Sequence, residues 1–202
     1  MDKIICVGKN YSEHVREMQK IAGDAPAEKP VLFLKPPSAL VSVENGMTAE
    51  VVLPVGHGSV HHECEIVVRL DAGGEIDAVT VGLDMTLREL QTELKKKGQP
   101  WEVSKVFAGS AIIGPWVPIT TIAKWLDSEF SLQLNGQTKQ KGHGREMTLS
   151  PTECVAYAKS FFPLCKGDLI FTGTPAGVGP VKAGDIAMLG FADLVNFKVV
   201  WR

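Results

Sequence analysis

The chain has 202 residues, of which 45% are hydrophobic and 22% are charged, so it has enough apolar material for one substantial core and no compositional sign of disorder. Its formal net charge is -2 and its longest cationic run is Lys95-Lys96-Lys97, which argues against nucleic acid and acidic membranes as partners. The apolar stretch near the N-terminus is too short for a signal peptide or a membrane span, so we expect a cytoplasmic protein with one domain over residues 1–202.

The first thirty residues predict a strand and then a helix on a breaker-rich connector. Residues 3–7 predict a short strand that is apolar after Lys3, and Ser12 is a suitable N-cap for a helix that runs to about residue 22. His14 and Glu17 are three residues apart, so they share one face of this helix. Because glycine and prolines interrupt the segment that follows, we expect residues 12–30 to form a mobile lid.

Three carboxylates lie in or beside a predicted hairpin over residues 63–84. Glu63 and Glu65 share one face of an expected strand, because successive side chains of a strand point to opposite faces. The returning strand ends at Asp84, and pairing should bring it back toward Glu65. Such close carboxylates repel one another unless a cation or protons intervene, and oxygen ligands favour Mg²⁺ or Mn²⁺ over Ca²⁺ and zinc. A solvated polar face on an edge strand is the alternative that these residues leave open.

The remaining elements are short. Thr86 and Glu89 predict a capping box for a helix over residues 86–97 that Gly98 ends, and Ser150 caps a helix that runs through residue 161. The Asn135-Gly136 pair predicts a hairpin over residues 130–139. Further strands are expected at residues 31–34, 39–43, 51–55, 169–172, 186–189 and 195–201.

Many short strands with few helices and no regular alternation of the two indicate an α+β domain that is mostly β, with a rolled or barrel-like sheet. The glycine-rich segment 172–180 lacks the Gly-Lys-Ser/Thr of a phosphate loop. It is either a tight turn or a nest of backbone N–H groups that receives a substrate carboxylate. Four scattered cysteines without a Cys-x-x-Cys pair are expected to be buried thiols rather than disulfides.

Several segments together resemble the fumarylacetoacetate hydrolase family, most closely its compact branch of acylpyruvate hydrolases and oxaloacetate decarboxylases. The matching segments are Val7-Gly8-Lys9-Asn10-Tyr11 with His14, Phe33-Leu34-Lys35-Pro36, His62-Glu63-Cys64-Glu65, Leu83-Asp84-Met85-Thr86, Lys95-Lys96-Lys97-Gly98, Ser104-Lys105, and Thr172-Gly173-Thr174-Pro175 with Gly177-Val178-Gly179-Pro180. Their order and spacing span nearly the whole chain. The resemblance implies a rolled, mixed or antiparallel β-sheet with a few short helices, and a homodimer.

The resemblance also assigns roles to residues. It implies that Glu63, Glu65 and Asp84 bind Mg²⁺ or Mn²⁺, with no organic cofactor. The implied catalytic residues are His14, Glu17 and Lys105, and the implied substrate-binding residues are Lys9, Gln91, Gly173 and Thr174. Lys9 stands where relatives often have arginine, and a lysine offers a point charge instead of a bidentate fork. Lys35 matches a family position either as a substrate contact or as a structural ion pair.

The implied activity is divalent-metal-dependent hydrolysis of acylpyruvates, in which a C–C bond is cleaved to give a carboxylate and pyruvate. His14, oriented by Glu17, would activate the water, and the cation would stabilise the pyruvate enolate. Oxaloacetate decarboxylation would need only the cation and Lys105. A 2-oxo-dienoate hydratase or isomerase and an oxaloacetate tautomerase are alternatives, since the same fold and ligands serve them too. The alternative outside the enzymes is an inactive metal-binding member of the family.

Overall fold

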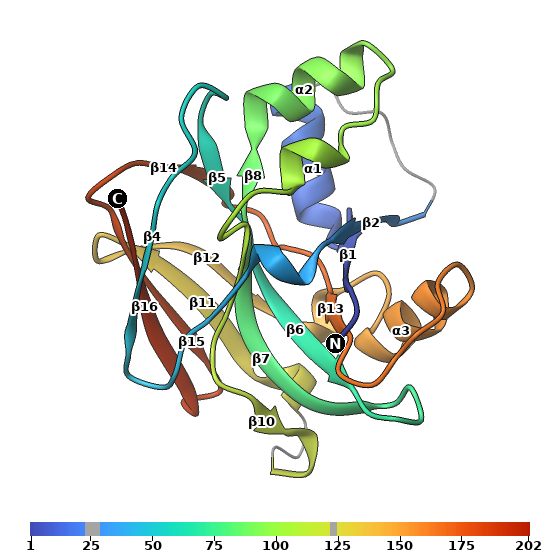
Figure 1. Cartoon of the computed structure of the whole chain (residues 1–202). Coiled ribbons are helices and arrows are strands. Elements are labelled where there is room, and N and C mark those ends of the chain that lie inside the picture. The colour runs from blue at the N-terminus through green and yellow to red at the C-terminus, as the bar shows by residue number, and fades with distance from the viewer. Residues whose placement is uncertain (23–28, 122–124) are drawn as a thin grey trace.

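The computed structural model describes residues 1–22, 29–121 and 125–202, and most of the described chain is β-strand (Figure 1). The largest sheet contains, in spatial order, β2 (Val31–Lys35), β1 (Ile4–Gly8), β13 (Leu169–Phe171), β6 (Cys64–Leu70), β7 (Ile76–Asp84), β9 (Ala111–Ile113) and β3 (Leu40–Ser42), and β10 (Val117–Pro118) pairs with β7. A second sheet contains β12 (Gln137–His143), β11 (Glu129–Leu134), β15 (Ile186–Phe191), β16 (Val195–Trp201) and β4 (Thr48–Val51). A small third sheet contains β14 (Gly179–Val181), β5 (Val60–His62) and β8 (Thr86–Leu87).

The sheets are mixed and curl around one main core, as predicted. Three strand pairs are parallel, namely β1 with β13, β3 with β9 and β4 with β16, and the other pairs are antiparallel. The helices are α1 (Ser12–Ala22), α2 (Arg88–Lys96) and α3 (Pro151–Lys159). Short 3-10 helices span η1 (Pro37–Ala39), η2 (Glu102–Lys105), η3 (Ile119–Thr121), η4 (Trp125–Asp127) and η5 (Gly144–Glu146). In Figure 1, α1 and α2 lie together at one end of the sheets, and α3 lies beside β13.

Strand β6 is buried on both of its faces, which explains why its alternation of polar and apolar residues is imperfect. Ile66 and Val68 pack on one face of the strand, in the main core. Val67 packs on the other face, in a smaller cluster that contains Phe33. Glu65 shares the face of Val67 by strand periodicity. Glu63 and Glu65 therefore lie at one end of the strand face on which Val67 packs in the smaller cluster.

Two element predictions are wrong, and in both cases a tertiary contact decides. The strand expected at residues 51–55 runs instead over Thr48–Val51, where it pairs in parallel with β16. The helix expected from residue 86 begins at Arg88, because Thr86 lies in β8 and its hydroxyl donates to Glu63 Oε1 at 3.1 Å. Glu89 accepts hydrogen bonds from the backbone and hydroxyl of Ser59 at 2.6 and 2.7 Å, so the capping box does not form.

The other elements agree more closely with the sequence. The predicted bounds of α1 are confirmed, and α3 carries the expected capping box, although it ends at Lys159. The Asn135-Gly136 hairpin is formed by β11 and β12. All four cysteines are free thiols, but Cys165 is exposed, against the expectation that all would be buried. The connector predicted after α1 lies almost entirely outside the described residues.

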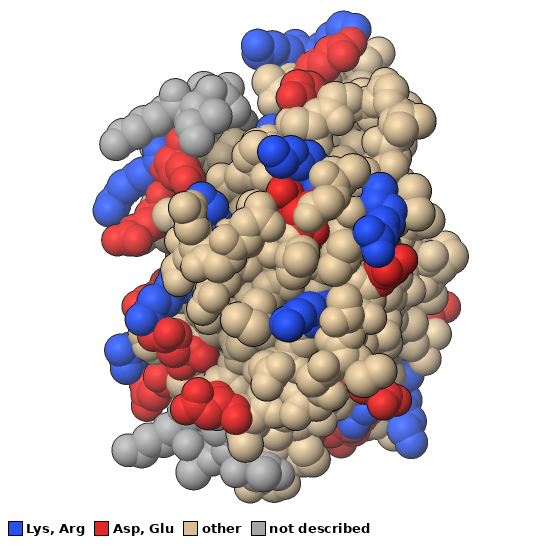
Figure 2. All heavy atoms as spheres, turned by 90° about the vertical axis from the view of Figure 1, so that its left-hand side faces the viewer, with Lys and Arg blue, Asp and Glu red and all other residues tan. Residues whose placement is uncertain are grey.

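No helix among the described residues has the length and apolar character needed to cross a membrane. Figure 2 shows the face at the left of Figure 1, where β4, β15 and β16 lie. On this face the cationic and anionic side chains are interspersed instead of gathered in a patch of one sign.

Asp168 ties the N-terminal strand to the sheet, and its removal should cost stability. Its carboxylate accepts hydrogen bonds from the backbone of Asp2, Lys3 and Cys165 at 2.9 to 3.1 Å. Burial acts to raise its pKa, but these bonds and the Lys3 ammonium outweigh burial and lower it. A carboxyl with a lowered pKa contributes stability above its unfolded value, and that contribution disappears as the pH falls through the folded value.

We therefore expect Asp168→Asn to lower the free energy of unfolding by about 2 kcal/mol at pH 7, the scale of hydrogen bonds to a charged group. The loss should begin to shrink below about pH 4, where the carboxyl of the unfolded chain takes up a proton, and it should vanish only as the pH falls through the lowered folded pKa. Urea denaturation at pH 7 and at pH 3.5 measures both values. An equal loss at the two pH values would show that the charge of Asp168 does not matter.

Candidate active site

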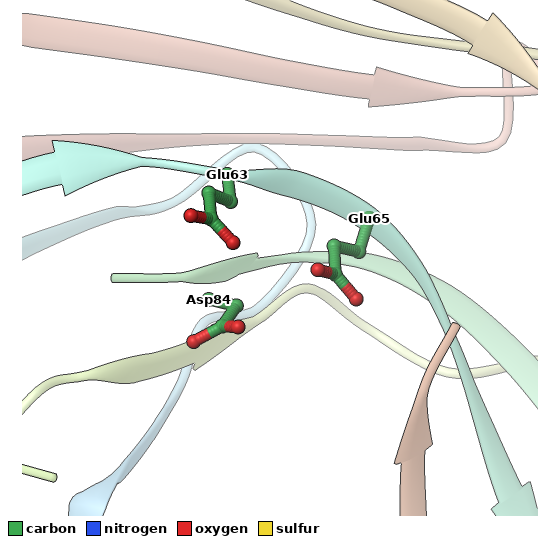
Figure 3. Close-up of side chains that lie close together, drawn as sticks. All are labelled: Glu63, Glu65 and Asp84. Atoms are coloured by element: carbon green, nitrogen blue, oxygen red, sulfur yellow. The ribbon is translucent and has the colours of Figure 1, made fainter. Parts of the chain in front are cut away.

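Two neighbouring strands bring three carboxylates to one point (Figure 3). Glu63 immediately precedes β6, Glu65 lies within it, and Asp84 ends β7. The Asp84 backbone N–H donates to the Glu63 carbonyl at 2.9 Å, so Asp84 lies opposite Glu63 and not Glu65, toward which the sequence placed it. One oxygen of each carboxylate lies within 4.8 Å of the others, and all three residues are buried. The carboxylates therefore form one cluster instead of a solvated face.

Three cations surround this cluster. Lys105 Nζ lies 2.8 Å from both Glu63 Oε2 and Asp84 Oδ2, and Arg88 contacts Glu63 Oε1. Lys35 Nζ lies 2.9 Å from Asp84 Oδ1 and also donates to the carbonyls of Met85 and Lys105. Lys35 is buried beneath the site, so its role is that of a structural ion pair.

The surroundings shift the pKa values of Glu63 and Glu65 in opposite directions. Burial, followed by the neighbouring Asp84 and Glu63 carboxylates, raises the pKa of Glu65 well above its usual range. Burial acts on Glu63 in the same direction, but Lys105 and Arg88 outweigh it and hold the pKa of Glu63 well below its usual range. For Lys105, burial is outweighed by Asp84 and Glu63, which raise its pKa, so it stays an ammonium and cannot act as a base.

The cluster fits a hard divalent cation. Its donors are carboxylate oxygens, which Mg²⁺ and Mn²⁺ prefer. Asp84 Oδ1 is buried, yet among the described residues it accepts no hydrogen bond and has only the Lys35 ammonium beside it. Burial first, and then the Asp84 and Glu63 carboxylates, raise the pKa of Glu65, and a cation bound among the three would favour its ionised form. Glu63, Glu65 and Asp84 are therefore the residues that would hold the cation.

A histidine and a glutamate of α1 form the predicted dyad. His14 Nδ1 lies 3.2 Å from Glu17 Oε2, and the Gly177 backbone N–H donates to both Glu17 oxygens at 3.0 and 3.2 Å. Burial acts to raise the pKa of Glu17, but the hydrogen bonds from His14 and Gly177 outweigh it and lower the pKa. Since an ionised Glu17 can only accept, Nδ1 of His14 donates the hydrogen, and in the neutral imidazole this tautomer leaves the lone pair on Nε2.

His14 of the dyad and Glu63 of the carboxylate cluster line a cavity of about 410 Å³, whereas Glu17, Glu65 and Asp84 are not among its lining residues. Its lining includes the predicted residues Lys9, His14, Glu63, Gln91 and Lys105. Met18, Val31, Phe33 and Trp101 form an apolar wall, and α2 contributes a polar face that consists of Arg88, Gln91, Thr92, Lys95 and Lys96. Five lysine and arginine side chains line the cavity against the carboxylate of Glu63, so it favours an anionic ligand.

Residues 3–199 match the family model described as the fumarylacetoacetate (FAA) hydrolase C-terminal domain. The chain belongs to the fumarylacetoacetate hydrolase family. Oxaloacetate tautomerase YcgM from Escherichia coli is 37% identical over 196 residues, which cover 92% of this chain and 86% of the relative. The human mitochondrial oxaloacetate tautomerase FAHD1 is 36% identical over 208 residues, which cover 97% of this chain and 90% of the relative.

A solved structure of the same family has the same fold. Fumarylpyruvate hydrolase from Pseudomonas aeruginosa, in complex with Mn²⁺ and pyruvate, is 36% identical and superposes with a TM-score of 0.90. The match covers 98% of this chain and 88% of that one. The chain is therefore an enzyme of the fumarylacetoacetate hydrolase family, among whose members are hydrolases and oxaloacetate tautomerases.

In this member of the fumarylacetoacetate hydrolase family, the glycine loop at residues 173–177 bonds to the protein's own carboxylates. The Gly173 N–H donates to Glu65 Oε2 at 2.7 Å, with a φ of 103° that favours glycine. The Thr174 hydroxyl donates to the Cys64 carbonyl at 2.8 Å. Direct substrate contacts by Gly173 and Thr174 stay predictions.

Arg88 is the site residue that the sequence analysis missed. Its guanidinium contacts Glu63 and donates to Gln91 Oε1 at 2.8 Å, so it links the carboxylate cluster to the cavity wall. The available signal was the helical spacing of Arg88, Gln91, Thr92 and Lys95, which places them on one polar face. That face lies on a different side of the helix from Leu90 and Leu94.

Proposed function

We propose that the protein is a Mg²⁺- or Mn²⁺-dependent enzyme of 2-oxo dicarboxylates, and that its main reaction is keto–enol tautomerisation of oxaloacetate. The observation that carries the proposal is a cavity lined by Glu63 of the carboxylate cluster, by His14 of the His14–Glu17 pair and by five lysine and arginine side chains. The sequence analysis placed acylpyruvate hydrolysis first. The names of the bacterial and human relatives move the tautomerase ahead of it.

The charges of the site favour a ligand with two negative charges. Glu63, Glu65 and Asp84 are offset one for one by the three surrounding cations, so a bound divalent ion leaves the site with two excess positive charges. Uncompensated buried charge is costly, and a dianion removes that cost. Lys95 and Lys96 add positive charge along the cavity wall. A 2-oxo dicarboxylate matches this environment better than an acid with a neutral acyl group.

The chain's own residues supply the proton transfers. A divalent ion held by Glu63, Glu65 and Asp84 would polarise the 2-oxo group and stabilise the negative charge that develops on its oxygen. His14 Nε2 takes the proton from carbon 3 of oxaloacetate and then returns a proton to the 2-oxo oxygen, so the enol forms with no net gain or loss of protons. Glu17 holds the imidazole in the required tautomer, and the Lys105 ammonium adds fixed positive charge beside the oxygen.

Hydrolysis of an acidic acylpyruvate is the second candidate, because the fumarylpyruvate hydrolase has the same fold. In that reaction His14 takes a proton from water, which attacks the distal carbonyl. The C–C bond then breaks, the acyl group leaves as a carboxylate, and carbon 3 of the pyruvate enolate takes up a proton. Both reactions use the same base and need the same stabilised enolate.

The deciding experiment follows four signals in parallel, with Mn²⁺ present or chelated. These signals are the loss of oxaloacetate enol absorbance, CO₂ release from oxaloacetate, and pyruvate release from fumarylpyruvate and from acetylpyruvate. Fast metal-dependent loss of the enol with slow release of pyruvate supports the tautomerase. Faster cleavage of fumarylpyruvate favours the hydrolase, CO₂ release above the metal-only background favours the decarboxylase, and no turnover overturns the proposal.

Lys96 gives a test of the charge argument. We expect Lys96→Gln to lower kcat/KM for dicarboxylates by about two- to fivefold, the scale of one partly screened ion pair, and to leave acetylpyruvate unchanged. Lys97→Gln is the matched control, because Lys97 ends the same lysine run but pairs with Glu93 on the exposed side of α2. Equal losses for acidic and neutral substrates would contradict a role in recognising the second carboxylate.

The homodimer and the cytoplasmic location expected from the sequence stay predictions. Sedimentation equilibrium at several protein concentrations measures the mass in solution and tests the dimer. The small organic substrate expected as the binding partner likewise stays a prediction.

A further inference from the structure

We propose that Gln140 is a positioning residue that clamps the strand of the carboxylate cluster to the glycine loop and so sets both cation affinity and the geometry of the His14–Glu17 pair. Gln140 lies on β12 in the second sheet, and its side chain is buried. The catalytic part of this inference rests on the proposed function. The structural part depends only on the contacts of Gln140.

Two backbone partners of Gln140, the Cys64 N–H and the Pro175 carbonyl, show which end of its amide accepts hydrogen bonds and which end donates them. The amide oxygen accepts from the Cys64 backbone N–H at 2.9 Å, and the amide nitrogen donates to the Pro175 carbonyl at 2.9 Å. The orientation of the amide is therefore determined. The oxygen also accepts from His62 Nδ1 at 2.9 Å, and the nitrogen also donates to the Thr174 hydroxyl at 2.7 Å. All four hydrogen-bonding positions of the side chain are used.

On the strand side, these bonds hold the peptide groups between two carboxylates. Cys64 separates Glu63 from Glu65, and its side chain packs in the core on the opposite face. Gln140 holds the N–H of Cys64, and the Thr174 hydroxyl, which accepts from Gln140, holds the carbonyl of Cys64 at 2.8 Å. The direction in which Glu63 and Glu65 point is thereby coupled to Gln140.

The Gln140 amide also holds the glycine loop at residues 173–177, which contacts both the carboxylate cluster and the His14–Glu17 pair. The loop donates one backbone N–H to Glu65 from Gly173 and another to Glu17 from Gly177. It also packs closely against β12, because a Cβ built on Gly177 would lie 2.1 Å from the Lys139 carbonyl oxygen. A displacement of the loop would therefore move a carboxylate of the cluster and the partner of His14 together.

Two variants distinguish the hydrogen bonds that Gln140 makes to the strand from those that it makes to the glycine loop. Gln140→Glu keeps an oxygen for Cys64 and His62 but loses the donors to Thr174 and Pro175, whereas Gln140→Leu loses all four bonds. Gln137→Leu is the matched control, since Gln137 begins the same strand but is exposed. Hydrogen exchange measured by mass spectrometry then reports on the amides of residues 173–177 and on those of residues 62–66.

We expect Gln140→Glu to accelerate exchange at residues 173–177 alone, and Gln140→Leu to accelerate it in both segments. In Gln140→Leu the affinity for Mn²⁺, measured by electron paramagnetic resonance, should fall about tenfold, and kcat should fall more than KM changes. The acidic limb of the pH profile, which reports the general base, should also shift, because Glu17 loses its fixed partner. Gln137→Leu should leave all of these quantities unchanged.

A lower melting temperature with unaltered exchange in both segments and unaltered Mn²⁺ affinity would overturn the inference, because it would show that Gln140 only fills space. The two proposals fail in different ways. If the wild-type protein neither binds Mn²⁺ nor turns over any 2-oxo acid, the proposed function is wrong. The exchange pattern of the variants then still decides whether Gln140 clamps the loop to the strand.

Discussion

Replacement of His14 by alanine is expected to lower kcat for oxaloacetate tautomerisation and for acylpyruvate hydrolysis by about 100-fold or more, the usual contribution of a general base. His14 lines the cavity beside Glu63 and Lys105, and its Nδ1 is held by Glu17. The variant should keep its affinity for Mn²⁺, because His14 does not belong to the carboxylate cluster. Initial rates with saturating Mn²⁺ and a Mn²⁺ titration of the same samples measure both effects.

The matched control is Arg16→Ala, since Arg16 is exposed on the same helix and does not line the cavity. Glu17→Gln is a second test, because the Gly177 N–H would take the amide oxygen and the amide NH2 would donate to Nδ1, which favours the wrong imidazole tautomer. We expect a loss of about the same size for that variant. Turnover by His14→Ala at near wild-type rate would remove the dyad from the mechanism, whereas a matching loss in Arg16→Ala would mean that the helix itself had been disturbed.

Residues that act within one segment could be predicted from the sequence. The spacing of His14 and Glu17 specifies a shared helix face, and the spacing of Glu63 and Glu65 specifies a shared strand face. In both cases the structure brings the side chains together as expected. Local geometry was sufficient here because each pair belongs to one regular element.

Residues that act between segments could not be predicted in the same way. Gln140 stands in a run of polar residues after the hairpin turn, and nothing in that run distinguishes a buried amide from a solvated one. Thr86 and Glu89 have the spacing of a capping box, but Glu63 and Ser59 are stronger partners in the folded chain. Lys95 and Lys96 lie in the last turn of their helix, where cations commonly complement the helix dipole, yet both line the cavity. Each of these outcomes depends on a partner that is distant in sequence.

Replacement of Glu65 by glutamine is expected to abolish turnover and to reduce Mn²⁺ affinity by about 100-fold or more, while the metal-free protein becomes more stable at neutral pH. Glutamine keeps an oxygen for the Gly173 N–H but removes a charge that burial and the Asp84 carboxylate disfavour. A carboxyl with a raised folded pKa contributes stability below its unfolded value of about 4.3, and that contribution is lost as the pH rises toward the folded value. Metal-free wild-type protein should therefore lose stability above about pH 4.3, and the variant should lose less.

A cation bound beside Glu65 should offset the loss of stability that its ionised carboxylate causes. We expect this effect in the wild-type protein and not in Glu65→Gln. Mn²⁺ at 100 times its Kd stabilises the folded state by about 2.7 kcal/mol, which raises Tm by about 5–10 °C for a chain of this size. Thermal unfolding with Mn²⁺ or with chelator, at pH 5 and pH 8, compares the two proteins. Glu50→Gln is the matched control, because Glu50 is an exposed carboxylate paired with Arg202. An equal rise of Tm with Mn²⁺ in wild type and in Glu65→Gln would place the cation elsewhere, because neutralising one of three ligands must weaken its binding.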